Sequence, residues 1–357
     1  SRLMKMKKIL TIILSIIVAV SFNGCKATQN TEPQDDARIK IVTTLFPYYD
    51  FVRAVTKGVD GISITMTVAP GQDSHSFEPT PKDIIKIENA DLFIYNGGTL
   101  ETWVDSVLGA LSNDEQVMRM MDYVDVMEEE TVEGMDLRYE HSHDHSEEMH
   151  SHSEESEHSH DEENEHSHDE ESEHSHDDKE YDEHIWLSIR NAEILVKNIA
   201  QEIANIDVKN AEIYEKNADC YIKKLDYLDK QYAATIKNGK YKAILFGDRF
   251  PFRYLANDYQ LKYYAAFAGC SAETMAGFET VTFLAQKVDT LHLPVILTIE
   301  NSDGRIAESI KANTAKKDQG ILVMNSLQSV TNEQLLDGIT YLKVMRENLS
   351  VLSKALN

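Results

Sequence analysis

Short apolar runs alternate with amphipathic segments along most of the chain. Three runs rich in β-branched and aromatic residues, at 39–44, 62–68 and 90–95, predict buried strands. The segments between them, 48–56 and 83–89, place apolar residues at helical spacing and predict helices. Strands that alternate with helices are typical of a parallel sheet with helices on its faces. The sequence therefore predicts an α/β lobe.

One longer segment, 208–237, has a purely helical pattern. Its apolar residues recur at intervals of three or four and so lie on one face of a helix. They are Tyr214, Ala218, Tyr221, Leu225, Leu228, Tyr232 and Ile236. We predict a long, rigid connecting helix here.

The α/β pattern starts again after this helix. Further apolar runs predict strands at 241–246, 263–268, 294–299 and 320–324. The predicted fold class is α/β, with two lobes, each a mostly parallel sheet flanked by helices, joined by one long rigid helix. Parallel sheets bind ligands outside the carboxyl ends of their strands. The residues just past the strand ends are therefore candidates: His75, Asn96, Asp248, Cys270, Glu300 and Asn325.

The first residues have the pattern of an export signal. Lysines precede the apolar run 9–20, which is too short to span a bilayer and has the length of a signal-peptide core. Residues 22–25 resemble a bacterial lipobox, in which Cys25 is lipidated and becomes the mature N-terminus; the alternative is a plain signal peptide cut nearby. The polar stretch 26–37 is suited to a flexible tether. We expect an extracytoplasmic protein anchored to the cell membrane by lipid on Cys25.

Composition narrows the classes of function. The chain has 357 residues, 42% of them hydrophobic, which is enough for two domains with real cores. Of the net charge of −26, residues 140–183 carry −19, with twenty acidic side chains against Lys179. No basic surface for nucleic acid is expected, and metal cations are favoured as partners. Three cysteines are too few for a disulfide scaffold.

The acidic segment contains a histidine repeat. His-Ser-His recurs with a period of eight in a background of Glu and Asp, and eleven of the fourteen histidines lie there. Imidazole binds zinc, copper and nickel, and the carboxylates attract cations. We predict a disordered loop with several weak zinc sites; the alternative is a solvated acidic loop without a metal role. The histidines are His141, His143, His145, His150, His152, His158, His160, His166, His168, His174 and His176.

Three histidines lie outside the repeat. His75 is in a turn-rich loop between a strand and a helix, where a side chain can face a cleft. His184 follows the acidic loop and opens a helix. The alternative to a functional role is a structural histidine at the start of a helix, stacked on Trp186. His292 precedes a strand at the end opposite the expected cleft, and we expect a structural role.

Three stretches carry a family resemblance: 68–79 (VAPGQDSHSFEP), 90–98 (ADLFIYNGG) and 184–188 (HIWLS). The chain from about residue 40 onward resembles the zinc- and manganese-specific substrate-binding lipoproteins of bacterial ABC transporters. The resemblance implies two α/β lobes joined by a long helix and a metal between them, held by His75 and His184. An acidic His-rich loop before the second ligand is typical of the zinc-specific members. The implied role is zinc capture and delivery to a membrane permease, not catalysis.

The C-terminal part departs from the family pattern. Where members have a third ligand, His or Glu, this chain has Asp248 and Arg249, and the fourth ligand position aligns near Asn325. Two neutral imidazoles leave Zn(II) with its full charge, so we expect a carboxylate to complete the shell. Asp248 is the first choice and Glu300 the second. Two further donors stay open, Cys270 and Glu273.

The predicted function is an extracytoplasmic receptor that captures Zn(II) in an interlobe cleft and delivers it to an ABC-transporter permease. We expect a monomer that is not an enzyme. The alternatives are a Mn(II)-specific receptor of the same fold, an extracellular zinc buffer or adhesin, and a zinc hydrolase, although no HExxH motif is present. The predicted parts are a signal peptide (1–25), a tether (26–37), an N-terminal lobe (38–206) that includes the His-rich loop (139–183), a linking helix (207–238) and a C-terminal lobe (239–357).

Overall fold

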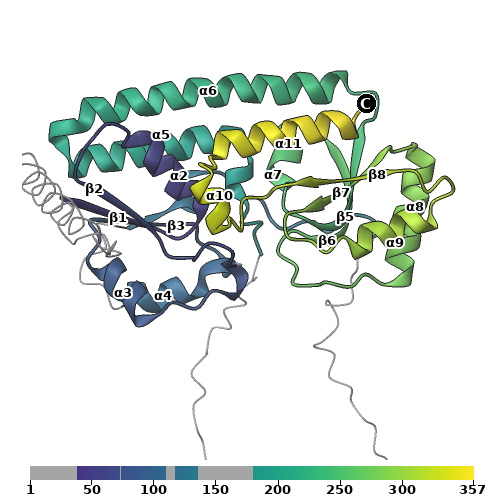
Figure 1. The fold of residues 1–357 in the computed structure, drawn as a ribbon, viewed down its shortest axis with the longest axis horizontal. Coiled ribbons are helices and arrows are strands. Elements are labelled where there is room, and N and C mark those ends of the chain that lie inside the picture. Colours follow the sequence, from purple (N-terminus) through teal and green to yellow (C-terminus); the bar gives the residue numbers. More distant parts are fainter. Residues whose placement is uncertain (1–37, 73, 110–116, 136–179) are drawn as a thin grey trace, which may run out of the picture. The chain divides into compact units, whose positions relative to one another are not determined.

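The N-terminal lobe is built on a four-stranded parallel sheet with the strand order β2-β1-β3-β4 (Figure 1). The computed structural model describes residues 38–72, 74–109, 117–135 and 180–357. The predicted signal peptide, tether, Cys25 and the eleven loop histidines lie outside the described residues. The strands are β1 (Ile39–Thr43), β2 (Ile62–Met66), β3 (Leu92–Tyr95) and β4 (Val117–Arg119).

Helices and short 3-10 turns surround this sheet. The three strands predicted for this lobe are confirmed, whereas β4 has only three residues and is too short to show an alternating pattern. The helices are α2 (Phe46–Val55), α3 (Pro81–Glu88), α4 (Thr102–Leu108) and α5 (Ile189–Ile206). The 3-10 turns are η1 (Ser74–Ser76), η2 (Thr99–Glu101), η4 (Met120–Tyr123), η5 (Ile185–Leu187) and η6 (Val208–Asn210).

Local sequence fixes where two of these helices begin. Thr80 and Asp83 form a capping box at the start of α3, in which each side chain accepts the other residue's backbone N–H. The Ser188 hydroxyl caps α5 by accepting the backbone N–H of Asn191 at 3.0 Å. The second cap holds the residues just before α5, which include His184, in a defined position.

The connecting helix α6 (Ala211–Asn238) is the longest helix of the described residues. All seven apolar positions predicted to share one face are buried, so the sequence prediction is confirmed. This face packs against α5 and α2 of the N-terminal lobe and against α11 (Tyr341–Ala355) of the C-terminal lobe (Figure 1). The Tyr232 hydroxyl, for example, donates to the Met345 carbonyl at 2.5 Å. One helix therefore supports both sheets.

The C-terminal lobe has a second parallel sheet, with the order β6-β5-β7-β8. The strands are β5 (Ala243–Phe250), β6 (Lys262–Ala268), β7 (Val295–Ile299) and β8 (Gly320–Met324). The remaining helices are α7 (Arg253–Asp258), α8 (Phe278–Leu291), α9 (Arg305–Asn313) and α10 (Asn332–Leu336). The four predicted strands are confirmed, and the fold is the predicted α/β pair of lobes.

Strand β5 is longer than the sequence predicts. It continues to Phe250 through a register shift between Phe246 and Arg249, so Asp248 lies within the strand and not just after it. Gly247 sits at the shift, where a Cβ atom would come within 2.6 Å of the Ala307 Cα in α9. Glycine at this position lets helix α9 pack closely against the strand.

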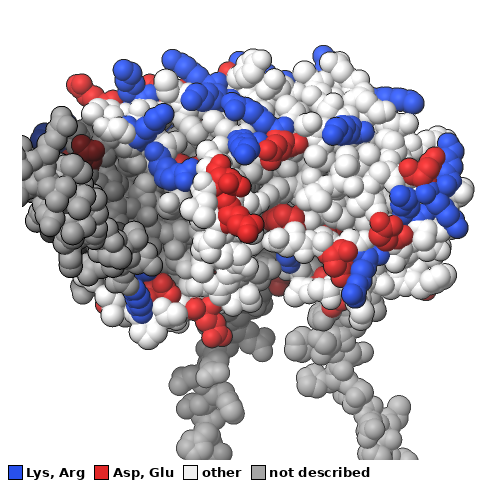
Figure 2. All heavy atoms as spheres, in the orientation of Figure 1, with Lys and Arg blue, Asp and Glu red and all other residues white. Residues whose placement is uncertain are grey.

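The described surface carries charges of both signs. On the face shown in Figure 2, Lys and Arg side chains are frequent along the edge formed by α6, and Asp and Glu side chains lie among apolar and neutral groups elsewhere. Most of the negative charge of the chain therefore belongs to the His-rich segment. No helix within the described ranges has both the length and the apolar character needed to cross a membrane.

Candidate metal centre

His184 is completely buried at the N-terminal end of η5, and its ring is held from one side by Asp182. The Asp182 Oδ1 atom accepts the backbone N–H of His184 at 2.9 Å and lies 3.0 Å from His184 Nδ1. A carboxylate on Nδ1 fixes the orientation of the ring and leaves Nε2 as the atom that can bind a metal. This is the arrangement commonly found behind metal-binding histidines.

The residues before His184 are attached to the carboxyl end of the N-terminal sheet. Asn96, which follows β3, donates from Nδ2 to the Glu183 carbonyl at 2.9 Å. The Glu183 carboxylate accepts the Thr99 hydroxyl at 2.7 Å and the Leu100 backbone N–H at 2.7 Å. Gly98 has a φ of 83°, and a Cβ there would overlap the Glu183 carboxyl group. The predicted candidate Asn96 thus positions the segment that carries His184.

Trp186 links His184 to the C-terminal lobe. The two rings meet at an edge, with centroids 5.5 Å apart and planes at 60°, so the predicted contact exists but is not a stack. Trp186 Nε1 donates to the Ser326 carbonyl at 2.9 Å, and the Tyr341 hydroxyl donates to the Trp186 carbonyl at 2.6 Å. The HIWLS motif therefore packs against the loop that follows β8.

That loop brings Gln328, which the sequence interpretation missed, to His184. The Gln328 amide nitrogen lies against His184 Nε2, and the side chain is buried. Asn325 shapes the loop because its Oδ1 accepts the Leu327 backbone N–H at 2.8 Å. Leu327 has a φ of 61°, an uncommon backbone conformation for a branched residue. The only sequence signal for Gln328 is a polar residue in a loop after a strand that is predicted to end at the cleft.

Cys270 approaches the same ring from the loop after β6. The Cys270 thiol and the His184 side chain each influence the pKa of the other. The Cys270 backbone N–H donates to Glu129 Oε1 at 3.1 Å. A Cβ on the preceding Gly269 would lie 2.9 Å from the Phe250 carbonyl oxygen and 3.2 Å from His184 Cε1. Only glycine lets this backbone pass so close to the imidazole.

These neighbours set the protonation of the site. Burial lowers the pKa of His184, but Asp182 and Cys270 raise it by more, and the result is a pKa of about 10. Burial raises the pKa of Cys270, and the nearby His184 opposes that rise. Any metal that binds His184 Nε2 at neutral pH therefore has to displace a proton.

The two carboxylates predicted as ligands hold their own loops. Asp248 accepts the Arg249 backbone N–H at 2.8 Å and the Ile299 backbone N–H at 3.3 Å. Glu300 accepts the backbone N–H and the hydroxyl of Ser326, at 2.7 and 2.6 Å. Burial raises the pKa of Glu300, and the Ser326 hydrogen bonds oppose that rise. Their roles as metal ligands stay predictions.

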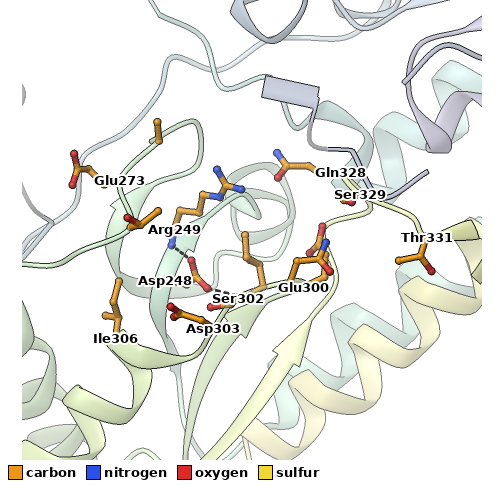
Figure 3. A pocket seen from close by; sticks show the side chains of 15 residues that line it. Asp248, Arg249, Glu273, Glu300, Ser302, Asp303, Ile306, Gln328, Ser329 and Thr331 are labelled. Carbon is orange, nitrogen blue, oxygen red and sulfur yellow. Dashed lines mark hydrogen bonds between the residues drawn. The ribbon is translucent and has the colours of Figure 1, made fainter. Parts of the chain in front are cut away.

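Both carboxylates line a cavity of about 580 Å³ between the lobes (Figure 3). Gly71 of the N-terminal lobe and Gln328 also line it. Arg249 extends into the same space and donates from Nη1 to the Ser271 carbonyl at 3.2 Å. Its positive charge opposes a cation in the adjacent part of the cavity.

His75 lies in η1, and its side chain is outside the described residues. The loop before it is tied to the C-terminal lobe, because the Gly71 backbone N–H donates to the Val330 carbonyl at 2.8 Å. The loops that carry His75 and Gln328 are therefore neighbours. Within the described residues, to which the His75 ring does not belong, no group of three or more His, Cys, Asp or Glu side chains is placed to hold a metal ion.

Comparison with known families decides which proteins this arrangement belongs to. The family model described as zinc-uptake complex component A, periplasmic (ZnuA) matches residues 41–355. The chain belongs to the ZnuA family. The resemblance inferred from three short motifs is therefore confirmed over almost the whole folded region.

Individual ZnuA relatives agree with this assignment. The zinc-binding protein AdcA of Streptococcus pyogenes serotype M3 is 30% identical over 354 residues, which are 97% of this chain but 61% of AdcA. The chain thus spans about three fifths of the AdcA relatives it matches. The high-affinity zinc uptake system protein ZnuA of Bacillus subtilis is 30% identical over 347 residues, and 97% of each chain is covered.

Solved structures give the same fold. The Zn(II)-bound ZnuA-like domain of Streptococcus pneumoniae AdcA has a TM-score of 0.65 at 25% identity, and covers 89% of this chain and 98% of that domain. The metal-dependent lipoprotein YcdH of Bacillus subtilis has a TM-score of 0.66 at 27% identity, with 89% and 99% covered. The AdcA and ZnuA relatives are named as zinc-binding and zinc-uptake proteins, which agrees with the prediction of a metal-binding protein.

Proposed function

We propose that this chain is an extracytoplasmic receptor that captures Zn(II) between its two lobes, with His75 and His184 as ligands, and delivers it to an ABC-transporter permease. One observation carries the proposal. His184 is buried, Asp182 holds its Nδ1, and its Nε2 faces a residue of the opposite lobe, Gln328. A ring fixed in this way is ready to bind a metal between the lobes.

Zinc is the cargo that the donor chemistry and the relatives support. Neutral imidazole nitrogen suits tetrahedral zinc, whereas Mn(II) prefers shells dominated by oxygen. AdcA and ZnuA relatives are named as zinc-binding and zinc-uptake proteins, and one structural relative is Zn(II)-bound. When zinc is bound to His184, the negative charge of Asp182 offsets part of the +2 charge of the ion through the imidazole.

The location proposed for this receptor rests on the N-terminal sequence and on one relative. The AdcA of Streptococcus pneumoniae serotype 4 is named a zinc-binding lipoprotein and is 30% identical over 353 residues. A lipid on Cys25 would hold the receptor at the membrane next to its permease. The acidic His-rich segment would raise the local concentration of zinc by weak binding.

Titration of zinc against a competing chelator tests the proposal. We expect His184→Ala and His75→Ala each to weaken the tightest site by on the order of 100-fold or more, because each removes a direct ligand. His292→Asn is the matched control: it also removes an imidazole, and asparagine tolerates the left-handed backbone at this position, where φ is 55°. Wild-type affinity in the His184→Ala variant would overturn the assignment.

A further inference from the structure

A short antiparallel ribbon leads into His184. One arm is formed by residues 127–129 and the other by residues 180–182, and the two arms pair at Glu128 and Tyr181. The second arm continues directly into His184. The position of the candidate ligand therefore depends on how this ribbon is held.

One hydroxyl group of the C-terminal lobe bonds to both arms of the ribbon. The Tyr254 hydroxyl, in α7, donates to the Asp182 carbonyl at 2.6 Å and accepts the Met127 backbone N–H at 3.0 Å. The Asp182 backbone N–H donates in turn to the Met127 carbonyl at 2.9 Å. The Tyr254 side chain is buried, and burial raises the pKa of its hydroxyl, which therefore keeps its proton and continues to donate.

Asp182 connects this hydroxyl to the imidazole of His184. Tyr254 fixes the Asp182 backbone, and the Asp182 carboxylate lies 3.0 Å from His184 Nδ1 and accepts the His184 backbone N–H at 2.9 Å. The aspartate side chain is short, so a shift of its backbone moves the carboxylate by a similar distance. A metal-binding side chain needs a position defined to within about 0.5 Å, which depends on the residues that support it.

We propose that Tyr254 is a positioning residue of the metal centre, through which the C-terminal lobe fixes the orientation of His184 by way of Asp182. The inference rests on the proposed function, since it assumes that zinc binds His184. Tyr254 is not a ligand in this proposal, because its hydroxyl bonds to two backbone groups of the ribbon. Without the hydroxyl, the buried Asp182 carbonyl loses this donor, and the carboxylate that orients the imidazole is free to shift.

The same lobe contains a matched control, Tyr263 in β6. The Tyr263 hydroxyl donates to Glu130 Oε2 at 2.9 Å, so it too bonds to a residue next to the ribbon. Its partner is a half-exposed side chain and not the backbone of Asp182. Tyr263→Phe and Tyr254→Phe each remove one hydroxyl group, but only the second removes a support of the His184 ring.

Titration of Zn(II) against a competing chelator, with the full chain, tests the proposal. We expect Tyr254→Phe to weaken the tightest site by on the order of tenfold and Tyr263→Phe to bind as the wild type does. In an Asp182→Asn background, Tyr254→Phe should weaken binding by about threefold or less, because the charge that the hydroxyl positions is already absent. Losses that multiply in full in the double variant would overturn the proposal.

Nuclear magnetic resonance of the metal-free chain, labelled with ¹⁵N-histidine, gives a second readout. The Nδ1–H of His184 is buried against Asp182 and should exchange slowly with water. Its signal is identified by its absence in His184→Ala. We expect the signal to be kept in Tyr263→Phe and to be shifted or lost in Tyr254→Phe, with circular dichroism verifying that both variants are folded. A tyrosine that only stabilises the fold would lower the unfolding temperature without changing this signal.

The two hypotheses fail in different ways. If folded Tyr254→Phe keeps both the signal and the wild-type zinc affinity, while His184→Ala still loses tight binding, the role of Tyr254 is wrong and the proposed function stands. Tight zinc binding that is independent of His184 would overturn the proposed function itself.

Discussion

The two halves of the candidate metal centre are built in different ways. In the N-terminal lobe, Asp182, Glu183 and His184 are consecutive residues. Asp182 accepts the backbone N–H of His184, and Glu183 is bonded to Asn96 and Leu100, which follow β3. In the C-terminal lobe, the groups near His184 come from two separate loops, after β6 and after β8. The first half is rigid and local, and the second depends on how distant segments pack.

This difference indicates where metal selectivity is set. A pre-positioned imidazole binds many divalent metals with similar geometry. The donors from the other lobe decide the charge and the softness of the completed shell. Arg249 and Gln328, cationic and neutral residues, line the cavity together with the carboxylates Asp248 and Glu300. The C-terminal half therefore places groups of different charge near the candidate centre.

Within the N-terminal half, Asp182→Asn is expected to lower zinc affinity most without removing a direct ligand. The substitution keeps the size of the side chain but removes the charge that orients Nδ1–H and raises the basicity of the imidazole. We expect zinc affinity at the tight site to fall by about 10 to 100-fold. Chelator competition measures it. Asp122→Asn, at an exposed carboxylate that pairs with Arg119, serves as the control and should bind as the wild type does.

A single substitution in the C-terminal half should increase the affinity for zinc. Gln328→Glu places a carboxylate beside His184 Nε2, where the wild type has an amide. At pH 8 we expect zinc to bind on the order of tenfold more tightly, since an added anionic donor lowers the remaining charge of the ion. Gln328→Ala, the neutral control, should stay close to the wild type. If the glutamate variant binds no better than the alanine variant, Gln328 does not lie next to the metal.

The sequence predicted features that depend on neighbouring residues, but not those that depend on contacts between distant segments. The strands and the buried face of α6 followed from patterns within a few residues of each other. The candidates His75 and His184 came from short motifs, and their roles as metal ligands stay predictions. Gln328 could not be found in this way, because its contact with His184 depends on the positive φ of Leu327 and joins residues that are 144 positions apart in the sequence. Asp248 was placed after a strand that in fact continues through a register shift, which no hydrophobic pattern reveals.

The N-terminal half contains a buried carboxyl group, Glu101, so the stability of the protein should depend on pH. Glu101 accepts the Gly97 backbone N–H at 2.9 Å in the loop that binds Glu183, and burial raises its pKa to about 7. The unfolded pKa is lower, so the folded state holds this proton more tightly. The resulting stabilisation is full below the unfolded pKa and is lost as the pH rises through 7.

Thermal unfolding between pH 5 and pH 8 measures this effect. We expect the stability of the wild type to fall by roughly 3 kcal/mol at most over this range from Glu101 alone. Glu101→Gln should remove most of that decline and should melt at a higher temperature than the wild type at pH 8. Equal pH dependence in both proteins would show that the Glu101 carboxyl is not held protonated by burial.

The smallest effect on the tight site is expected from deleting residues 140–178. The ends of this segment are held together outside the deletion, since the Glu129 backbone N–H donates to the Glu180 carbonyl at 2.8 Å and the Asp182 N–H to the Met127 carbonyl at 2.9 Å. The metal-binding half that follows should keep its geometry, and a polar segment contributes little to the core. Zinc titration followed by calorimetry should therefore show one tight site with unchanged affinity and the loss of several weaker ones. A weakened tight site would mean that the His-rich segment supplies a ligand to the centre, and that the local half is less self-contained than the contacts of His184 indicate.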